Sequence, residues 1–196
     1  APSRAYRQGS QRDLGLWARQ ATTKPIVGVG RLTDPDLMVE LLRAGAMDLV
    51  GGARPSIADP FLPAKIREGR YNDIRECIGC NVCARTAEFG APHLNCTQNA
   101  TAGEEHRRGW HPEFIPATAT PDRSVLVVGG GPAGMECAIV LGKRGFEHVH
   151  LVEAGSDLGG HMRWVPNLPN MGIWNRVVEW RVSQLRALTN VETIVN

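Results

Sequence analysis

The sequence predicts an α/β protein made of three successive parts. Three observations predict this fold class. Short apolar runs alternate with amphipathic segments in the first third, four closely spaced cysteines follow, and a glycine-rich turn joins a strand to a helix in the last third. Alternating strands and helices are typical of parallel sheets. We expect the parts to span residues 1–75, 76–122 and 123–196.

Composition argues against two classes of partner. The 196 residues carry 22 Lys and Arg against 20 Asp and Glu, and 6% are aromatic, so neither charge nor stacking surface favours nucleic acid. No apolar run approaches the roughly 20 residues of a membrane-spanning helix. Cysteines without a signal peptide favour a reducing, cytoplasmic location. Because the chain begins at Ala1 without Met and ends just after a predicted strand, we expect a fragment of a longer polypeptide.

The first part is expected to contain a β-α-β unit flanked by two helices. Leu14, Trp17 and Ala21 form a helical stripe. Asp34 is a typical helix N-cap, and Gly45 is a typical stop for the helix that it opens. The expected elements are a helix over 13–21, a strand over 26–30, a helix over 37–44, a strand over 47–50 and a helix over 61–68.

Both strands of that unit end in a glycine-containing turn with an arginine. The turns are Gly30-Arg31 and Gly52-Ala53-Arg54. At the carboxyl ends of neighbouring parallel strands, backbone N–H groups and a planar guanidinium can bind a phosphate. In a (β/α)8 barrel, the loops after strands 7 and 8 form the usual phosphate site. A surface arginine beside a tight turn is the simpler interpretation of either turn alone.

Four cysteines in the middle part have the spacing C-x2-C-x2-C-x12-C; they are Cys77, Cys80, Cys83 and Cys96. A tight triplet with one distant cysteine is typical of an iron-sulfur cluster, here a [4Fe-4S] cube. Structural zinc is an alternative, although zinc sites usually pair two C-x2-C knuckles. Disulfides are a second alternative, which a reducing compartment disfavours. The fifth cysteine, Cys137, falls in an apolar helical run, where we expect a small buried residue.

The rest of the middle part predicts little regular structure. Residues 71–110 are rich in Gly, Asn, Thr and Pro, which indicates a loop that its metal holds in place rather than a packed core. His93, His106 and His111 could serve as ligands or bases, but four cysteines already complete a ligand set. Residues 114–122 contain several prolines and are expected to form an extended linker.

The last part carries a G-x-G-x-x-G fingerprint in the setting that this motif requires. An apolar strand precedes the glycines, a helix follows them, and Glu153 ends the next strand. Gly129 permits a tight turn, Gly131 lets a pyrophosphate approach the helix N-terminus, and Gly134 lets the helix pack closely on the strand. Glu153 is expected to accept hydrogen bonds from ribose hydroxyls, which argues against a 2'-phosphate. A helix over 173–188 and a strand over 191–195 would complete half of a Rossmann-type domain.

The order of these parts resembles the iron-sulfur branch of the Old Yellow Enzyme family. The resemblance rests on V-G-V-G-R and G-G-A-R-P-S-I-A-D-P, then R-E-C-I-G-C-N-V-C and N-C-T-Q-N-A-T-A-G-E-E, and finally V-V-G-G-G-P-A-G. Within the family, the chain is similar to the trimethylamine, dimethylamine and histamine dehydrogenase group. The resemblance implies that residues 1–75 are the C-terminal part of an FMN-binding TIM barrel, in which Gly30, Arg31, Ala53 and Arg54 bind the FMN phosphate.

The same resemblance implies the other cofactors. The four cysteines of the middle part would ligate the [4Fe-4S] cluster. The three fingerprint glycines and Glu153 would bind ADP in an amine dehydrogenase, or FAD in the related dienoyl-CoA and enoate reductases. The family's covalent flavin link and acid-base residues lie upstream, so no catalytic residue is assigned and the fragment alone is expected to be inactive. Ala87 stands where trimethylamine dehydrogenase has an aromatic residue of the substrate bowl, which argues against trimethylamine as the substrate.

The implied function is oxidation of a small amine at FMN. Electrons would pass singly through the cluster to an electron-transferring flavoprotein, and the full-length protein would be a homodimer. One alternative is an NAD(P)H-dependent 2,4-dienoyl-CoA or enoate reductase, which runs electrons in the opposite direction. The other alternative is a non-catalytic electron-transfer fragment.

Overall fold

A computed structural model describes residues 5–90 and 94–196 and divides the chain into two compact units, Ala1–Pro112 and Glu113–Asn196. Each unit has its own hydrophobic core. Over the described ranges, no helix combines the length and the apolar character needed to cross a membrane.

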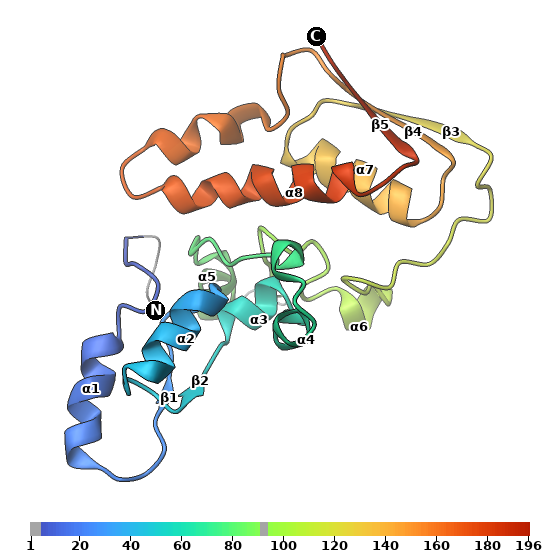
Figure 1. Cartoon of the computed structure of the whole chain (residues 1–196). Coiled ribbons are helices and arrows are strands. Elements are labelled where there is room, and N and C mark those ends of the chain that lie inside the picture. Colours follow the sequence, from blue (N-terminus) through green and yellow to red (C-terminus); the bar gives the residue numbers. More distant parts are fainter. Residues whose placement is uncertain (1–4, 91–93) are drawn as a thin grey trace. The chain divides into compact units, whose positions relative to one another are not determined.

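The first unit contains a parallel β-α-β arrangement, as the sequence predicts. Strands β1 and β2 pair in parallel, with Val27 opposite Leu49 and Gly28 opposite Val50. The elements of this unit are α1 (Arg12–Ala21), β1 (Val27–Gly28), α2 (Pro35–Arg43), β2 (Leu49–Val50), α3 (Arg54–Ala58), α4 (Leu62–Arg67), the 3-10 turn η1 (Tyr71–Asp73), α5 (Val82–Glu88) and α6 (Glu105–Arg108) (Figure 1).

Helix α2 shows why this part of the sequence folds as predicted. The Asp34 carboxylate accepts a hydrogen bond from the Asp36 backbone N–H at 2.9 Å, which satisfies one free donor at the start of the helix. The helix buries Met38 and Leu41 in the core of the unit. Gly45 follows the helix with a left-handed φ of 70°, which suits glycine.

The strands of the first unit are shorter than predicted. Beyond β1, Gly30 has a φ of 142° and Arg31 a φ of 57°, so the backbone leaves the extended conformation there. Before β1, the Ile26 N–H donates to the Asp48 carboxylate at 2.7 Å rather than to a strand carbonyl. A side chain thus takes the place of a ladder hydrogen bond at one end, and a turn begins at the other.

Three described helices in the first unit, α3, α5 and α6, were not predicted. Helix α3 begins at Arg54, directly after the second arginine turn, α5 begins at Val82 within the cysteine triplet, and α6 begins at Glu105. These helices have 5, 7 and 4 residues, which is too short for a 3.6-residue period to be recognised. The cysteine segment therefore contains a helical turn, although its composition predicts a loop.

The second unit is a parallel three-stranded sheet in the order β3-β4-β5. Helix α7 packs on the sheet and α8 lies beside α7 (Figure 1). The order and the parallel register match half of a Rossmann-type fold, as predicted. The elements are β3 (Ser124–Val128), α7 (Pro132–Lys143), β4 (His148–Glu153), three 3-10 turns η2 (Gly160–Arg163), η3 (Val165–Asn167) and η4 (Gly172–Asn175), α8 (Arg176–Arg186) and β5 (Val191–Val195).

The core of the second unit lies between the sheet and these two helices. Met135, Ile139, Leu151 and Trp180 are buried there. The predicted burial of Cys137 is wrong, because the buried face of α7 runs through Met135, Ala138, Ile139 and Gly142 and leaves the cysteine exposed on another face.

The segment predicted as a linker has no regular structure, and it is pinned to the second unit. The Thr118 N–H donates to the Arg144 carbonyl at 2.8 Å, and the Glu147 N–H donates to the Pro121 carbonyl at 2.9 Å. These bonds hold the chain on its approach to β3.

Candidate functional site

The four predicted cluster ligands lie in one neighbourhood. Cys77 and Cys80 precede α5, and Cys83 lies in its first turn. Cys96 approaches from the loop after that helix and lies close enough to the other three thiols to interact with each of them electrostatically. All five cysteines of the chain are free. The structure therefore brings the predicted ligands together without a disulfide among them.

Local backbone geometry makes this convergence possible. Gly79 and Asn81 have left-handed φ values of 70° and 62°, and glycine and asparagine are the residues that tolerate this conformation best. Hydrogen bonds then reach the sulfurs: Thr97 Oγ1 lies 3.1 Å from Cys80 Sγ, and the Gln98 N–H donates to Cys96 Sγ at 3.4 Å. Hydrogen bonds to cysteine sulfur are among the contacts that tune an iron-sulfur cluster.

Two of the four thiols, those of Cys77 and Cys96, have a raised pKa. Burial raises the pKa of Cys77, although the Gly79 N–H, Arg54 and Arg31 lower it. Burial also raises the pKa of Cys96, and so do the neighbouring thiols. Four thiolates at this site therefore need a positive partner, and iron ions supply such charge when a cluster is bound.

Among the described residues, no group of three or more His, Cys, Asp or Glu side chains is close enough together to hold one metal ion. A structural zinc ion would be held by four ligands, with each sulfur about 2.3 Å from the metal.

A buried hydrogen-bond network holds the two halves of the cysteine segment side by side. Arg75 Nη1 donates to the Gln98 carbonyl at 2.6 Å, and Gln98 Nε2 donates back to the Glu76 carbonyl at 3.2 Å. Asn99 Nδ2 donates to the Ile57 carbonyl at 3.0 Å. Gln98 and Asn99 are each 2% exposed. The segments that carry Cys77 and Cys96 are thus joined by amide and guanidinium contacts as well as by any metal.

This network continues into a buried ion pair. Asp59 accepts from Lys65 Nζ at 2.7 Å and from the Arg75 backbone N–H at 2.9 Å. The Asp59 and Lys65 side chains are 3% and 5% exposed. Lys65 Nζ also donates to the Asp73 carbonyl at 2.9 Å. The start of the cysteine segment is therefore fixed to α3 and α4 by buried and partly buried polar contacts.

The residues predicted at the flavin phosphate lie at the carboxyl ends of β1 and β2. Gly30 and Arg31 follow β1, and Ala53 is the N-cap residue of α3, of which Arg54 is the first residue. Arg31 is buried and donates to the Tyr6 carbonyl at 2.9 Å. The structure brings Arg31 and Arg54 near each other and near Cys77. Neighbouring positions on adjacent parallel strands account for this juxtaposition.

The remaining candidate residues of the sequence analysis are three histidines and Ala87. His106 is exposed on α6. The His111 ring packs against the Phe61 ring, with centroids 5.3 Å apart. His93 and the side chain of Ala87 lie outside the described residues.

The fingerprint glycines adopt the geometry that the motif requires. Gly129 has a φ of 102°, which favours glycine, and Gly131 is the N-cap residue of α7. A Cβ atom on Gly134 would lie 1.9 Å from the Gly129 carbonyl oxygen, so only glycine fits there. A Cβ atom on Gly131 would meet no atom within 4 Å. The helix N-terminus is therefore open on the side where a pyrophosphate would bind.

Glu153 lies directly beside this turn. One carboxylate oxygen accepts from the Gly130 N–H at 2.7 Å, and the other accepts from the Gly155 N–H at 2.8 Å. These backbone hydrogen bonds, that from Gly155 first, lower the pKa of Glu153. Each carboxylate oxygen has a second lone pair, so the side chain can still accept hydrogen bonds from ribose hydroxyls.

The lowered pKa of Glu153 gives a testable pH dependence. A carboxylate whose folded pKa lies below its unfolded value stabilises the fold above the unfolded pKa, and that contribution is lost as pH falls through the folded pKa. We expect Glu153→Gln to unfold at a lower temperature than the wild type at pH 7. Thermal unfolding between pH 7 and about pH 3 should show this gap closing below about pH 4.3. A gap that stays constant over the range would contradict the assignment.

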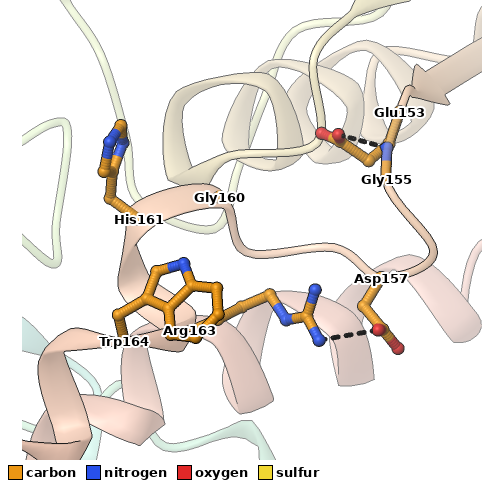
Figure 2. Close-up of a pocket in the computed structure, with 7 residues that line it drawn as sticks. All are labelled: Glu153, Gly155, Asp157, Gly160, His161, Arg163 and Trp164. Carbon is orange, nitrogen blue, oxygen red and sulfur yellow. Dashed lines mark hydrogen bonds and ion pairs between the residues drawn. The ribbon is translucent and has the colours of Figure 1, made fainter.

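A pocket of about 260 Å³ adjoins Glu153 (Figure 2). Arg163 pairs with Asp157 at 2.7 Å along its edge, and Trp164, which is 70% exposed, contributes its indole ring. The residues that line the pocket are Glu153, Gly155, Asp157, Gly160, His161, Arg163 and Trp164.

Sequence reasoning identified only Glu153 among these pocket residues. The sequence feature that could have predicted the other pocket residues is the second glycine pair, Gly159-Gly160, which follows Glu153 closely in the sequence. The Gly159 N–H donates to the Gly130 carbonyl at 2.8 Å, and a Cβ atom on Gly160 would lie 3.3 Å from Gly131 Cα. The second pair thus packs on the fingerprint and sets the pocket residues beside it.

Two family models match separate parts of the chain. Residues 2–73 match the NADH:flavin oxidoreductase / NADH oxidase family, and residues 127–195 match the NAD(P)-binding Rossmann-like domain. A flavin is therefore the cofactor expected of the first match, and a dinucleotide-type site is expected of the second.

Individual relatives extend the similarity over nearly the whole chain. Dimethylamine dehydrogenase of Hyphomicrobium sp. (strain x) is 53% identical over 95% of this chain and 25% of its own length. NADH oxidase of Thermoanaerobacter brockii is 36% identical over 94% of this chain and 27% of its own length. The solved structure of histamine dehydrogenase from Rhizobium sp. 4-9 superposes with a TM-score of 0.93 at 49% identity, over 100% of this chain and 28% of that one.

The chain spans about a quarter of the length of the curated relatives it matches. The identity is higher for the amine dehydrogenases than for the NADH oxidase. Over residues 2–73 the chain is therefore similar to the NADH:flavin oxidoreductase / NADH oxidase family, and over nearly its whole length it is similar to amine dehydrogenases.

Proposed function

We propose that this chain forms the electron-exit section of a flavin-dependent amine dehydrogenase. In this proposal, the first unit supplies the end of a TIM barrel with FMN-phosphate contacts from Gly30, Arg31, Ala53 and Arg54. The four cysteines Cys77, Cys80, Cys83 and Cys96 ligate a [4Fe-4S] cluster beside it. The second unit binds ADP through Gly129, Gly131, Gly134 and Glu153.

One observation carries this proposal: the predicted phosphate turns and the predicted cluster segment touch. Arg31, which follows β1, donates to the Cys77 carbonyl at 3.3 Å. This contact between Arg31 and Cys77 supports a flavin site and a cluster site that adjoin each other within one unit. Such proximity is what an electron path from flavin to cluster requires.

Residues of the cysteine segment would have two roles on that electron path, which are to hold the cluster and to set its potential. The cysteine segment would hold a cluster that carries one electron at a time, with a potential set by hydrogen bonding and burial. The sulfur hydrogen bonds from Thr97 and the Gln98 N–H, together with the burial of Cys77 and Cys83, are such controls. We propose that an electron-transferring flavoprotein receives the electrons and that the enzyme acts as a homodimer on a small amine.

The nucleotide site is proposed to bind ADP rather than a 2'-phosphorylated nucleotide. The Glu153 carboxylate is ionised at neutral pH, since its pKa is lowered. A negative charge at the ribose would repel a 2'-phosphate and would accept hydrogen bonds from the free hydroxyls.

Calorimetric titration tests this preference. We expect the chain to bind AMP at least about tenfold more tightly than adenosine 2',5'-bisphosphate, which differs from AMP only by the 2'-phosphate; a tenfold ratio corresponds to about 1.4 kcal/mol. Glu153→Gln should reduce the ratio by removing the charge while keeping the side-chain shape. Equal affinity of the wild type for both nucleotides would contradict the assignment of Glu153.

The rival function is an NAD(P)H-dependent reductase, which the NADH oxidase relative favours. The two functions differ in the electron donor, so the test uses protein expressed from the complete coding sequence and mixed anaerobically with one donor at a time. Dimethylamine is expected to bleach the flavin absorbance and then reduce the cluster, whereas NADH is expected to do neither. Bleaching by NADH without bleaching by dimethylamine or histamine would favour the reductase.

A further inference from the structure

Two arginines connect the phosphate turns to the cysteine segment. Arg31 Nη1 donates to the backbone carbonyl of Cys77 at 3.3 Å, and Arg54 Nη1 donates to the side-chain oxygen of Asn81. Cys77 is the first residue of the triplet, and Asn81 lies between its second and third cysteines. Each arginine therefore follows one strand of the β1-β2 pair and holds one section of the cysteine segment.

Arg31 retains a donor that these contacts do not use. Arg31 is 6% exposed, and its Nε atom is buried with no hydrogen-bond partner among the described residues. Buried polar atoms are normally paired, so this donor indicates a further acceptor. The left-handed φ of 57° at Arg31 is costly for a residue other than glycine and is typical of functional sites. An anionic oxygen is the acceptor that a guanidinium binds most strongly.

The charges around the two guanidiniums favour such an anion. Arg31 and Arg54 lie close enough to repel each other, and both lie near Cys77. Glu76 is the carboxylate that faces Arg31 from the cysteine segment. Two positive charges opposite one carboxylate leave a net attraction for further negative charge at this place.

We propose that Arg31 and Arg54 serve both sites at once, so that they bind the flavin phosphate and also set the reduction potential of the cluster. This inference rests on the proposed function. Positive charge beside Cys77 favours the reduced and more negative state of a cluster held there, and so raises its potential. A phosphate on the same arginines offsets that charge and lowers the potential. By linkage, reduction at the cysteines weakens phosphate binding by the same free energy.

Redox titration of the chain after anaerobic reconstitution with iron and sulfide tests the electrostatic half of the proposal. EPR monitors the reduction of the cluster during the titration, which is carried out in chloride buffer. Arg31→Gln and Arg54→Gln are each expected to lower the midpoint potential, whereas Arg31→Lys keeps the charge and stays nearer the wild type. Arg43→Gln removes a charge from an exposed position in the last turn of α2 and is expected to leave the potential unchanged.

Inorganic phosphate tests whether the arginines are shared. At constant ionic strength, which keeps screening equal, phosphate is expected to lower the midpoint potential of the wild type and not that of the Arg31→Gln/Arg54→Gln double variant. If Arg31→Gln fails to fold, Arg54→Gln still tests the proposal. The Arg54 side chain is only partly buried, so its replacement is expected to leave the fold intact.

The outcomes separate this inference from the proposed function. An unchanged potential in the glutamine variants, or a wild-type potential that does not respond to phosphate, would overturn the sharing of the arginines while the cluster stands. A shift of the same size in the midpoint potential of Arg43→Gln would mean that the net charge of the protein alone sets the potential. That result would also overturn the sharing of the arginines. A wild-type chain that takes up no iron would overturn the proposed cluster itself, and iron analysis before each titration distinguishes that case.

Discussion

Replacing Cys77 and Cys96 together with alanine is expected to lower the iron content after reconstitution from about four to below about one per chain. These residues bring the two separate ends of the cysteine segment to the site, and Cys96 is the only described ligand that comes from the returning loop. A cube cannot be held by two neighbouring thiols alone. Iron and acid-labile sulfide are measured together with the absorbance near the visible charge-transfer band.

The chain offers a matched control for this variant. Cys137 is exposed on α7 in the other unit, so Cys137→Ala should retain about four irons. The buried contacts among Arg75, Gln98 and Glu76 do not involve sulfur, so far-UV circular dichroism of the double variant should resemble that of the wild-type apoprotein. Equal iron uptake by all three proteins would rule out the four-cysteine site.

The second large effect is expected at Gly134. Alanine there would place a methyl carbon 1.9 Å from the Gly129 carbonyl oxygen, and this backbone cannot move without opening the turn between β3 and α7. Overpacking of this kind typically costs about 1–3 kcal/mol and occasionally more. For a domain of this size, each kcal/mol lowers the melting temperature by about 4–8 °C. Near-UV circular dichroism, which reports the buried Trp180, measures the transition of this unit.

Gly131→Ala separates binding from folding in the same loop. Its added methyl group meets nothing within 4 Å, and its φ of −71° is ordinary for alanine, so the melting temperature should stay near that of the wild type. The methyl group would occupy the space where a pyrophosphate approaches the helix, so ADP affinity should fall at least about tenfold. A large loss of stability in Gly131→Ala, or none in Gly134→Ala, would contradict the assigned roles of the two glycines.

The periodic and motif-based parts of the fold could be predicted from the sequence. The β-α-β unit and the parallel three-stranded sheet have apolar strands and amphipathic or capped helices that are locally consistent. The fingerprint also predicted its own backbone, because a strand, a tight turn and a helix leave little freedom at Gly129 and Gly134. The cysteine spacing predicted that four thiols would converge, and they do so around Gly79 and Asn81.

Contacts between segments far apart in the sequence could not be predicted in this way. The composition of residues 71–110 gave no sign that Arg75 would donate to the Gln98 carbonyl, or that Gln98 would donate to the Glu76 carbonyl. The contact from Arg31 to the Cys77 carbonyl joins residues 46 positions apart and leaves no local pattern. Exposure of Cys137 depends on which face of a largely apolar helix meets the sheet, and a weakly amphipathic helix does not specify that face.

The most direct test of the central proposal is EPR spectroscopy of the wild-type chain, reconstituted anaerobically with iron and sulfide and then reduced with dithionite. We predict about four irons per chain and the signal of a reduced [4Fe-4S] cluster, which would place Cys77, Cys80, Cys83 and Cys96 on an electron path. Binding of zinc in place of iron, or no metal uptake at all, would contradict the redox role of the cysteine segment.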